Sequence, residues 1–199
     1  MPEITASMVK ELREKTGVGM MECKAALAEA CGDFEKAIVH LRERGLMTAA
    51  KKAGRTAADG TVKAYIHAGG KIGVLIEVNC ETDFVANTDE FQALAYELAM
   101  QVAAANPLYV KREEVPEEIL QREREIARTQ LGDSKKPADI VEKILSGKVA
   151  KYYEEVCLLD QNYIKDPSKK VSQLVTDAVS KTGENIQVRR FARFKIGEE

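Results

Sequence analysis

Apolar positions in the first 54 residues recur with the spacing of three short helices. Thr5 and Asp33 can cap the first and third helices, and Gly17 and Gly45 are predicted to end them. The residues expected to mark the inward faces are Met8, Val9, Leu12, Met20, Cys23, Leu27, Ala30, Phe34, Ala37, Ile38 and Leu41. Because the connections are short, the helices should form a bundle, whose small size suggests a docking module.

The pattern changes to alternation after position 60, which predicts strands. The two faces of the first strand carry Val62, Ala64 and Ile66 on one side, and Lys63, Tyr65 and His67 on the other. Residues 68–71 (AGGK) then form a hairpin turn into a second strand, which ends at Cys80-Glu81. The second strand is apolar on both faces at Val74, Leu75, Ile76 and Val78, so we expect it in the middle of a sheet and buried on both sides.

A phenylalanine stands beside an aspartate on the short connection after the second strand, in the order Thr82-Asp83-Phe84-Val85. One interpretation is an exposed aromatic anchor on a rigid scaffold. The alternative is that Phe84 folds into the core and Asp83 caps the next helix. We expect Asn87 to cap that helix, which ends at Asn106-Pro107. Its apolar stripe is predicted to be Phe91, Leu94, Ala95, Leu98 and Val102.

Two further amphipathic segments lie between positions 112 and 160 and predict an antiparallel helical hairpin that projects from the core. Pro116 stands at the entry of its first helix, and Gly132-Asp133-Ser134 joins the two helices. The apolar positions of the first helix are Ile119, Leu120 and Ile126, and those of the second are Val141, Leu145, Val149, Tyr152 and Val156.

The last part of the chain predicts one more helix and one more strand. The helix is marked by Val171, Leu174, Val175 and Ala178 and closed by Thr182-Gly183. The alternation from Ile186 to Ile196 predicts a strand that joins the earlier hairpin, with Arg190 in its inward register. The fold class is therefore α+β: an N-terminal three-helix bundle (residues 1–54), then a core (55–199) of a small antiparallel sheet with helices on one face and the hairpin insertion at about 112–160.

Composition narrows the function classes. The chain has 199 residues, 45% hydrophobic and 31% charged, with a formal net charge of −2. This balance gives no long-range attraction to nucleic acid or to anionic membranes. No signal-peptide pattern and no run of 18 apolar residues is present, so we expect a cytoplasmic protein without membrane contact.

The four cysteines, Cys23, Cys31, Cys80 and Cys157, lack metal-ligand spacing and should be reduced, with Cys23 and Cys31 near one helix face.

Catalytic and nucleotide-binding motifs fail when their context is examined. Gly17-Val18-Gly19 has Glu22 in place of a third glycine, and Gly69-Gly70-Lys71 leads into a strand rather than a helix. His67 and Cys80 lie at opposite ends of a strand, about 30 Å apart, which is too far for a catalytic pair. We therefore expect neither an enzyme nor a bound cofactor or metal.

Two charged or polarisable clusters remain open to two interpretations. Arg189, Arg190, Arg193 and Lys195 could contact RNA, but a solvated edge strand is the favoured interpretation, so we expect no direct nucleic-acid binding. Met20, Met21 and Lys24 could form an adaptable contact surface, although the pattern alone favours core positions.

Four ordered motifs resemble those of bacterial elongation factor Ts: ITASMVKELREKTGVGMMECKAALAEACGDFEKAI (4–38), AADG (57–60), IEVNCETDFVAN (76–87) and NIQVRRFARFKIGE (185–198). The resemblance covers nearly the whole chain and is closest to compact members with one core subdomain. It implies a UBA-like N-terminal bundle and a guanine-nucleotide exchange factor for the GTPase elongation factor Tu.

The resemblance also implies roles for particular residues. Thr82, Asp83, Phe84 and Val85 would belong to the segment that dislocates Mg²⁺ from the GTPase, with Phe84 wedged between partner helices and Asp83 in polar contact beside it. The bundle's docking surface would include Val18, Gly19, Met20 and Lys24.

One departure from longer family members predicts a homodimer. The tip around His67 and Gly69 resembles a contact that longer members place on a second core copy, yet here the same copy carries Phe84. Two chains could therefore pair through a strand edge, one presenting Phe84 and the other His67. Two other hypotheses remain: an adaptor that binds peptide or RNA through residues 1–54 alone, and an enzyme using Cys80.

Overall fold

A computed structural model describes residues 4–132 and 137–198. Its contacts divide the chain into two compact units. The first consists of Met1–Thr61, Val78–Leu94 and Gln173–Gln187, and the second of Val62–Glu77, Ala95–Ser172 and Val188–Glu199. Each unit therefore contains segments that are distant in sequence.

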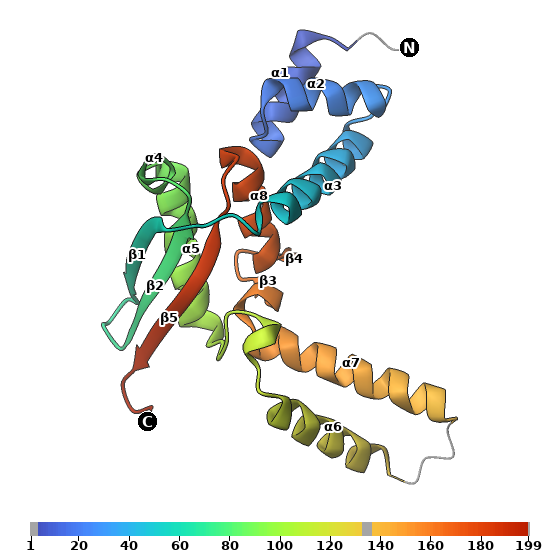
Figure 1. Ribbon diagram of the computed structural model, residues 1–199, viewed down its shortest axis with the longest axis vertical. Coiled ribbons are helices and arrows are strands. Elements are labelled where there is room, and N and C mark those ends of the chain that lie inside the picture. Colours follow the sequence, from blue (N-terminus) through green and yellow to red (C-terminus); the bar gives the residue numbers. More distant parts are fainter. Residues whose placement is uncertain (1–3, 133–136, 199) are drawn as a thin grey trace. The chain divides into compact units, whose positions relative to one another are not determined.

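The first unit begins with the expected three helices, α1 (Ala6–Thr16), α2 (Met20–Glu29) and α3 (Phe34–Lys52) (Figure 1). The Thr5 hydroxyl accepts the N–H of Met8 at 3.3 Å, and Asp33 accepts that of Lys36 at 3.1 Å. Gly17 ends α1 in the left-handed conformation, with φ +69°. The bundle core consists of Val9, Leu12, Cys23, Ala26, Leu27, Ala30, Ala37 and Leu41. The α+β fold class with an N-terminal helical bundle is confirmed.

The predicted end of the third helix at Gly45 is wrong, because α3 continues to Lys52. Gly45 is buried, and a Cβ placed there would lie 3.6 Å from the side chain of Ser180 in α8 (Val171–Thr182). The glycine therefore sits beneath another helix, and the segment that follows it, LMTAAKK, contains good helix formers. A glycine commonly ends a helix by adopting the left-handed conformation, which Gly45 does not adopt.

Gly60 explains the Ala-Ala-Asp-Gly motif. The residue lies in β1 (Asp59–Ile66) with φ +143°, and a Cβ there would approach the carbonyl oxygen of Val78 to 2.1 Å. Asn79 donates from its amide to the carbonyl oxygen of Asp59 at 3.1 Å, beside this close approach. Only glycine fits between these two backbones.

The three-stranded sheet has the order β1-β2-β5, with β2 (Ile72–Cys80) in the middle and β5 (Gln187–Lys195) beside it. The N–H of His67 donates to the carbonyl of Ile72 at 2.9 Å and closes the β1–β2 hairpin. The N–H of Ile196 donates to the carbonyl of Lys71 at 3.0 Å, so the end of β5 lies next to the start of β2. The predicted antiparallel sheet and the central position of the second strand are confirmed.

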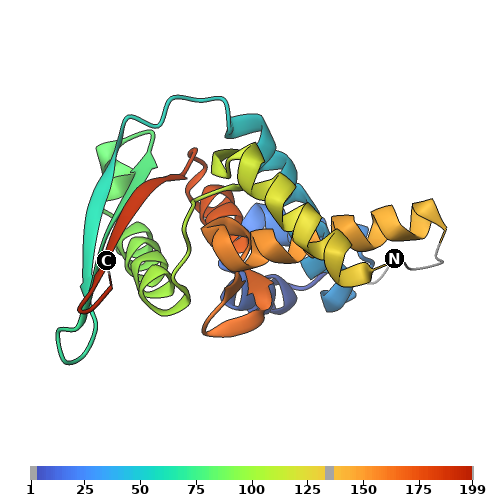
Figure 2. The same ribbon diagram turned by 90° about the horizontal axis from the view of Figure 1, so that it is seen from below.

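Helix α5 (Asp89–Ala105) covers one face of the sheet in the second unit (Figure 2). The rings of Tyr65 and Tyr96 meet edge to face with centroids 5.5 Å apart, and Arg193 donates to the carbonyl of Ala103 at 3.4 Å. The stripe predicted for this helix is buried at every position: Phe91, Leu94, Ala95, Leu98 and Val102.

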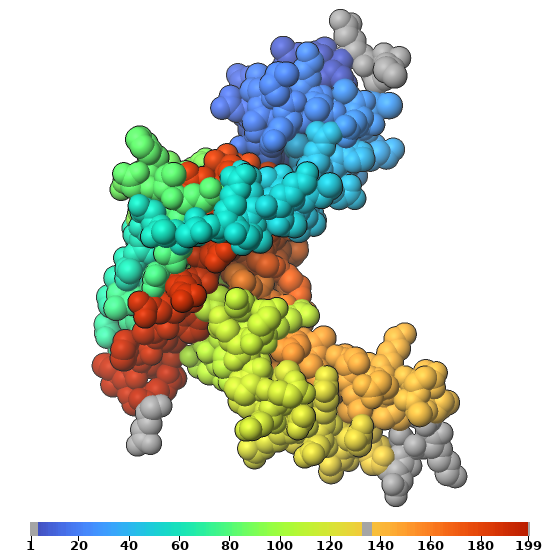
Figure 3. Space-filling model, in the orientation of Figure 1, coloured from blue at the N-terminus to red at the C-terminus, as the bar shows by residue number. Residues whose placement is uncertain are grey.

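The other face of the sheet is open among the described residues of this unit (Figures 2 and 3). Leu75 is 48% exposed, so the expectation that β2 is covered on both faces is wrong. Arg190 is also not inward: its side chain is 81% exposed and pairs with Glu77. Arg189 and Arg190 are both exposed, which shifts the alternation of β5 by one residue, and Arg193 points inward instead.

Helices α6 (Glu117–Leu131) and α7 (Ala138–Val156) form the predicted hairpin and lie side by side in both ribbon views (Figures 1 and 2). Leu120, Leu145 and Val149 are buried between or beside them. Ile126 was expected in the apolar stripe, but it is 42% exposed, and Ala127 is buried in its place. Of the predicted joint, residues 133 and 134 lie outside the described residues.

The segment after α7 contains structure that the pattern does not predict. It forms a 3-10 turn, η2 (Leu158–Asp160), and a small hairpin of β3 (Asn162–Tyr163) and β4 (Asp166–Lys170). Another 3-10 turn, η1 (Arg112–Glu114), precedes α6. The buried Gln101 organises the segment after α7: its amide donates to the side chain of Gln161 and accepts the N–H of Ile164 at 2.9 Å. These strands are short and polar, so they carry no apolar period.

Candidate partner-binding site

Thr82 begins a single helical turn, α4 (Asp83–Ala86), directly after β2. Its backbone is extended (φ −135°, ψ 155°), and its hydroxyl accepts the N–H of Val85 at 3.4 Å, as an N-cap does. The carboxylate of Asp83 lies in the first turn, where the helix dipole favours negative charge. Thr82, Asp83 and Val85 are thus fixed by the local geometry of a helix start.

Phe84 projects from this turn, and the residue is 83% exposed. Two features anchor the turn: its last residue, Ala86, is buried, and the buried Cys80 thiol donates to the carbonyl of Thr82 at 3.1 Å. The observation favours the exposed-anchor interpretation over the one in which Phe84 folds into the core. A large aromatic residue held out by a fixed backbone loses little conformational freedom when it binds.

The far side of the turn is closed by a second cap. Asn87 donates from its side chain to the carbonyl of Asp83 at 2.9 Å, so it ends α4. The cap of α5 is Thr88, whose hydroxyl accepts the N–H of Phe91 at 3.3 Å. The prediction that Asn87 caps the long helix is therefore wrong by one residue. The reason is that the single turn α4 uses Asn87 as its own end.

Cys80 is poorly suited to act as a nucleophile. Burial, and then the negative charge of Glu184, raise the pKa of its thiol from 9.0 to about 11. At neutral pH the thiol is protonated, and the thiolate is the reactive form. This disfavours the hypothesis of an enzyme that uses Cys80.

The predicted docking residues of the bundle lie at the α1–α2 connection and along α2. Gly19, Met20 and Lys24 are exposed, whereas Val18 is partly buried against the bundle core. Met21, beside them, is 78% exposed. The pattern-based preference for core positions is therefore wrong for Met20, Met21 and Lys24. These positions are exposed because α2 packs through Cys23, Ala26 and Leu27 instead.

His67 and Gly69 lie at the tip of the β1–β2 hairpin, in the second unit, and both are exposed. Gly69 and Gly70 have φ values of +87° and +68°, which the tight turn requires. The ring nitrogen Nδ1 of His67 lies 3.0 Å from the hydroxyl of Tyr65. The hairpin tip (residues 67–71) thus presents an imidazole on a glycine-rich turn.

The predicted site residues are divided between the two compact units. The four bundle residues and the segment 82–85 belong to the first compact unit, and His67 and Gly69 to the second. The pattern missed Glu184, whose carboxylate bonds the backbone of Thr82 across the fold. The only sequence signal for it is the helix-ending Thr182-Gly183 that precedes it.

Residues 4–132 and 137–198 lack the features of two other kinds of site. No helix there is long and apolar enough to cross a membrane. The same residues contain no group of three or more His, Cys, Asp or Glu side chains placed to hold a metal ion. All four cysteines are free, and Cys31, expected near the face of Cys23, is exposed because it lies beyond the end of α2.

An exposed aromatic residue on a fixed turn and an exposed Met-rich helix surface are features of a protein that binds another macromolecule. The family model for elongation factor TS matches residues 28–198. The chain is 63% identical over 198 residues to an elongation factor Ts of Anaeromyxobacter sp. (strain Fw109-5), covering 100% of this chain and 90% of the relative. It is 60% identical over 195 residues to that of Caldanaerobacter subterraneus subsp. tengcongensis, covering 98% of each. The chain belongs to the elongation factor Ts family and is a translation elongation factor of protein biosynthesis.

Proposed function

We propose that this protein is a guanine-nucleotide exchange factor that binds elongation factor Tu in its GDP form and promotes GDP release. The observation that carries the proposal is Phe84, an aromatic residue that is 83% exposed on a turn whose backbone is fixed on both sides. The residues proposed to act on the GTPase are Thr82, Asp83, Phe84 and Val85.

The proposed mechanism is displacement of the Mg²⁺ ion that the GTPase holds beside its nucleotide. Mg²⁺ requires near-octahedral geometry and bridges the nucleotide phosphates. A small shift of the partner helices by Phe84 would disturb this geometry and leave the phosphates poorly neutralised. A wedge can do this without catalytic groups, provided that it binds the distorted state of the GTPase more tightly than the relaxed state. Because the coupling is reciprocal, rebinding of nucleotide releases the factor.

The first 54 residues would dock on the GTPase, and the core from 55 to 199 would carry the turn that bears Phe84. Met20 and Met21 offer polarisable side chains that adapt to an apolar surface, and Lys24 adds one positive charge beside them. Val18 and Gly19 would position the start of α2 against the partner, and His67 and Gly69 would add a contact from the hairpin tip. No direct contact with nucleic acid is proposed, since Arg190 and Arg193 are paired with Glu77 and Glu198.

A homodimer belongs to the same proposal, but through the open face of the sheet rather than through a strand edge. That face carries exposed apolar side chains from all three strands: Val62, Ile66, Leu75 and Phe194. It also carries the ion pair of Glu77 and Arg190, so a copy related by a two-fold axis can match both apolar and charged groups. The occupant proposed here is therefore a second copy of this chain.

Light scattering tests the dimer. We expect a dimeric mass for the wild type and a monomeric mass for Phe194→Glu, with Leu108→Glu, an exposed apolar residue outside the sheet, as the matched control. A monomeric wild type, free and with its partner bound, would exclude the dimer.

The exchange function is tested by stopped-flow release of a fluorescent GDP from elongation factor Tu. The release rate should rise with the concentration of the factor and then saturate. If Mg²⁺ displacement is the mechanism, chelation of Mg²⁺ should accelerate release without the factor and reduce the further gain that the factor gives. Absence of any acceleration, with elongation factor Tu from several bacteria, would reject the proposal.

A further inference from the structure

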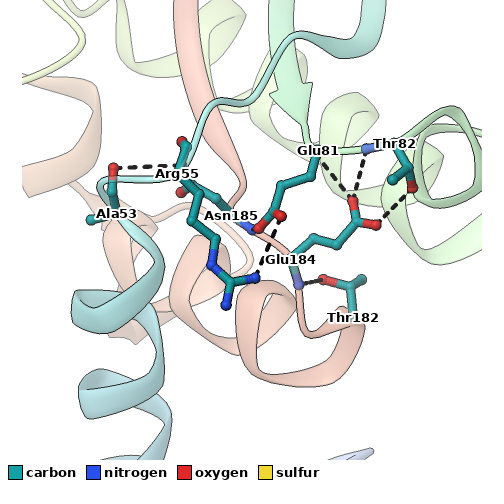
Figure 4. A network of polar contacts seen from close by, with 7 residues as sticks. All are labelled: Ala53, Arg55, Glu81, Thr82, Thr182, Glu184 and Asn185. Carbon is teal, nitrogen blue, oxygen red and sulfur yellow. Dashed lines mark hydrogen bonds and ion pairs between the residues drawn. The ribbon is translucent and has the colours of Figure 1, made fainter.

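Three donors at the junction of β2 and α4 converge on one carboxylate, that of Glu184 (Figure 4). Its Oε2 accepts the backbone N–H groups of Glu81 and Thr82, both at 3.1 Å. Its Oε1 accepts the hydroxyl of Thr82 at 2.6 Å. A single side chain from the C-terminal part of the chain thus binds the backbone immediately before Phe84.

These bonds satisfy groups that local structure leaves unpaired. The N–H groups of a residue before a helix and of its N-cap have no partner within the helix. A threonine hydroxyl has one proton and two lone pairs. Because the proton of Thr82 is directed to Glu184, a lone pair is free to accept the N–H of Val85, which closes α4 around Phe84. Glu184 therefore sets the orientation of the cap.

The position of Glu184 is itself fixed. Gly183 ends α8 in the left-handed conformation with φ +73°, and the N–H of Glu184 donates to the hydroxyl of Thr182 at 3.3 Å (Figure 4). That hydroxyl in turn donates to the carbonyl of Ala178 at 2.9 Å. The carboxylate is thus presented by a closed helix end rather than by a free loop.

A second carboxylate, that of Glu81, connects the same two segments in the opposite direction. Glu81 accepts the backbone N–H of Asn185 at 2.7 Å and lies 3.5 Å from the guanidinium of Arg55. The side-chain amide of Asn185 donates to the carbonyl of Arg55 at 2.7 Å. The carbonyl oxygen of Ala53 lies 3.5 Å from the same amide nitrogen. The turn that carries Phe84 is therefore tied to the end of α8 and to the chain that leaves the N-terminal bundle.

We propose that Glu184 is a positioning residue for nucleotide exchange, one that holds the Phe84 turn (residues 81–87) in the orientation required after docking. The inference rests on the exchange function proposed above. The buried contacts of Cys80 and Ala86 keep the turn folded without Glu184. Loss of the Glu184 carboxylate should therefore change the orientation of the Phe84 side chain more than it changes the fold. Small errors in the placement of an acting group are known to reduce rates strongly.

Glu184→Gln is the informative variant. An amide keeps one acceptor oxygen and turns an NH₂ group toward a donor, so at least one of the three donors loses its partner. We expect the maximal rate of GDP release to fall about tenfold, while the half-saturating concentration of the factor stays within about twofold of the wild type. Glu35→Gln, an exposed carboxylate in the first turn of α3, is the matched control and should behave as the wild type.

A second readout does not depend on exchange. The chain contains no tryptophan, so Phe84→Trp introduces a single fluorophore at the tip of the turn. In the free factor, adding Glu184→Gln should lower the fluorescence anisotropy of Trp at this position, and adding Glu35→Gln should not. If wild type fails to accelerate release but the anisotropy falls as expected, the exchange function fails and the positioning contact stands.

Two results would overturn the inference. The first is a Glu184→Gln variant with unchanged anisotropy and unchanged maximal rate. The second is a variant that melts early and loses affinity and maximal rate together, because this pattern indicates a general structural role.

Discussion

The two turns at the ends of strand β2 present their exposed side chains in different ways. The Phe84 turn is held by side chains: Glu184 accepts from Thr82, Asn87 donates to Asp83, and Cys80 donates to Thr82. These bonds come from residues near and far in sequence, and Ala86 is buried beneath them. The turn is therefore determined by several independent contacts.

The hairpin tip relies on its backbone. The N–H of Gly70 donates to the carbonyl of His67 at 2.9 Å, and the shape of the turn depends on the positive φ angles of Gly69 and Gly70. The side-chain contact described there is between Tyr65 and His67. We infer that the Phe84 turn is rigid enough to hold Phe84 in place as a wedge, and that the hairpin tip can adapt its shape to a partner surface. The following experiments test this contrast or the contacts of one of the two turns.

The largest expected effect is on thiol labelling. Cys31 is exposed and should react rapidly with a thiol reagent at neutral pH, whereas Cys80 is buried beneath the Phe84 turn. The rise in the pKa of Cys80 from 9.0 to about 11 lowers its thiolate fraction about 100-fold. Mass spectrometry after timed labelling should therefore find Cys31 modified long before Cys80. Equal rates at the two cysteines would mean that the turn opens readily.

Removal of the cap should have the next largest effect. Thr82→Ala loses the bond to Val85 and the bond to Glu184, so stability should fall by about 1 kcal/mol. The maximal rate of GDP release should fall about tenfold, because Phe84 loses its orientation.

Thr5→Ala is the matched control, since Thr5 caps α1 with the same type of bond. It should show a similar loss in thermal unfolding without the loss of maximal rate. Equal kinetic effects of the two cap variants would contradict a special role for the Phe84 turn.

A smaller effect is expected at the hairpin tip. Gly69→Ala places a side chain at φ +87° and should lower stability by about 1 kcal/mol. Because the tip is proposed to dock rather than to wedge, the variant should act on the half-saturating concentration and not on the maximal rate, as measured by stopped-flow release. A fall in maximal rate comparable to that of Thr82→Ala would remove the distinction between the two turns.

The smallest expected effect is on stability at acidic pH. The N–H of Asn185, more than the charge of Arg55, lowers the pKa of Glu81 below its ordinary value of 4.5. The stabilisation from ionised Glu81 should be fully present above pH 4.5 and lost as the pH falls through the lowered pKa. The difference in melting temperature between wild type and Glu81→Gln should shrink across that window, and solvent screening keeps it small. A difference that widens in acid would contradict the assignment.

Local signals in the sequence were sufficient for the helices of the bundle, except the end of the third, and for the hairpin turn and the position of the Phe84 turn. Thr5, Asp33 and Gly17 act through bonds to residues within a few positions, so their roles follow from the pattern. The covered stripe of α5 is likewise a matter of helical period.

Features that depend on distant parts of the chain were not predictable in this way. Gly45 lies under Ser180, and Glu184 bonds Thr82 across about a hundred positions, so neither role leaves a local trace. Whether Phe84 is buried or exposed also depends on what the rest of the fold places beside it. Exposure of Leu75 follows from the absence of a covering element among the described residues, which an apolar pattern cannot reveal.

The central claim is that exchange depends on the exposed Phe84. The most direct test compares wild type, Phe84→Ala and the exposed control Leu108→Ala in stopped-flow release of GDP from elongation factor Tu at saturating factor, together with their melting temperatures. We predict that Phe84→Ala lowers the maximal rate at least about 30-fold, as loss of about 2 kcal/mol at a binding hot spot would do, while all three proteins melt within about 2 °C of one another. A Phe84→Ala variant that melts normally and retains the wild-type rate would contradict the account.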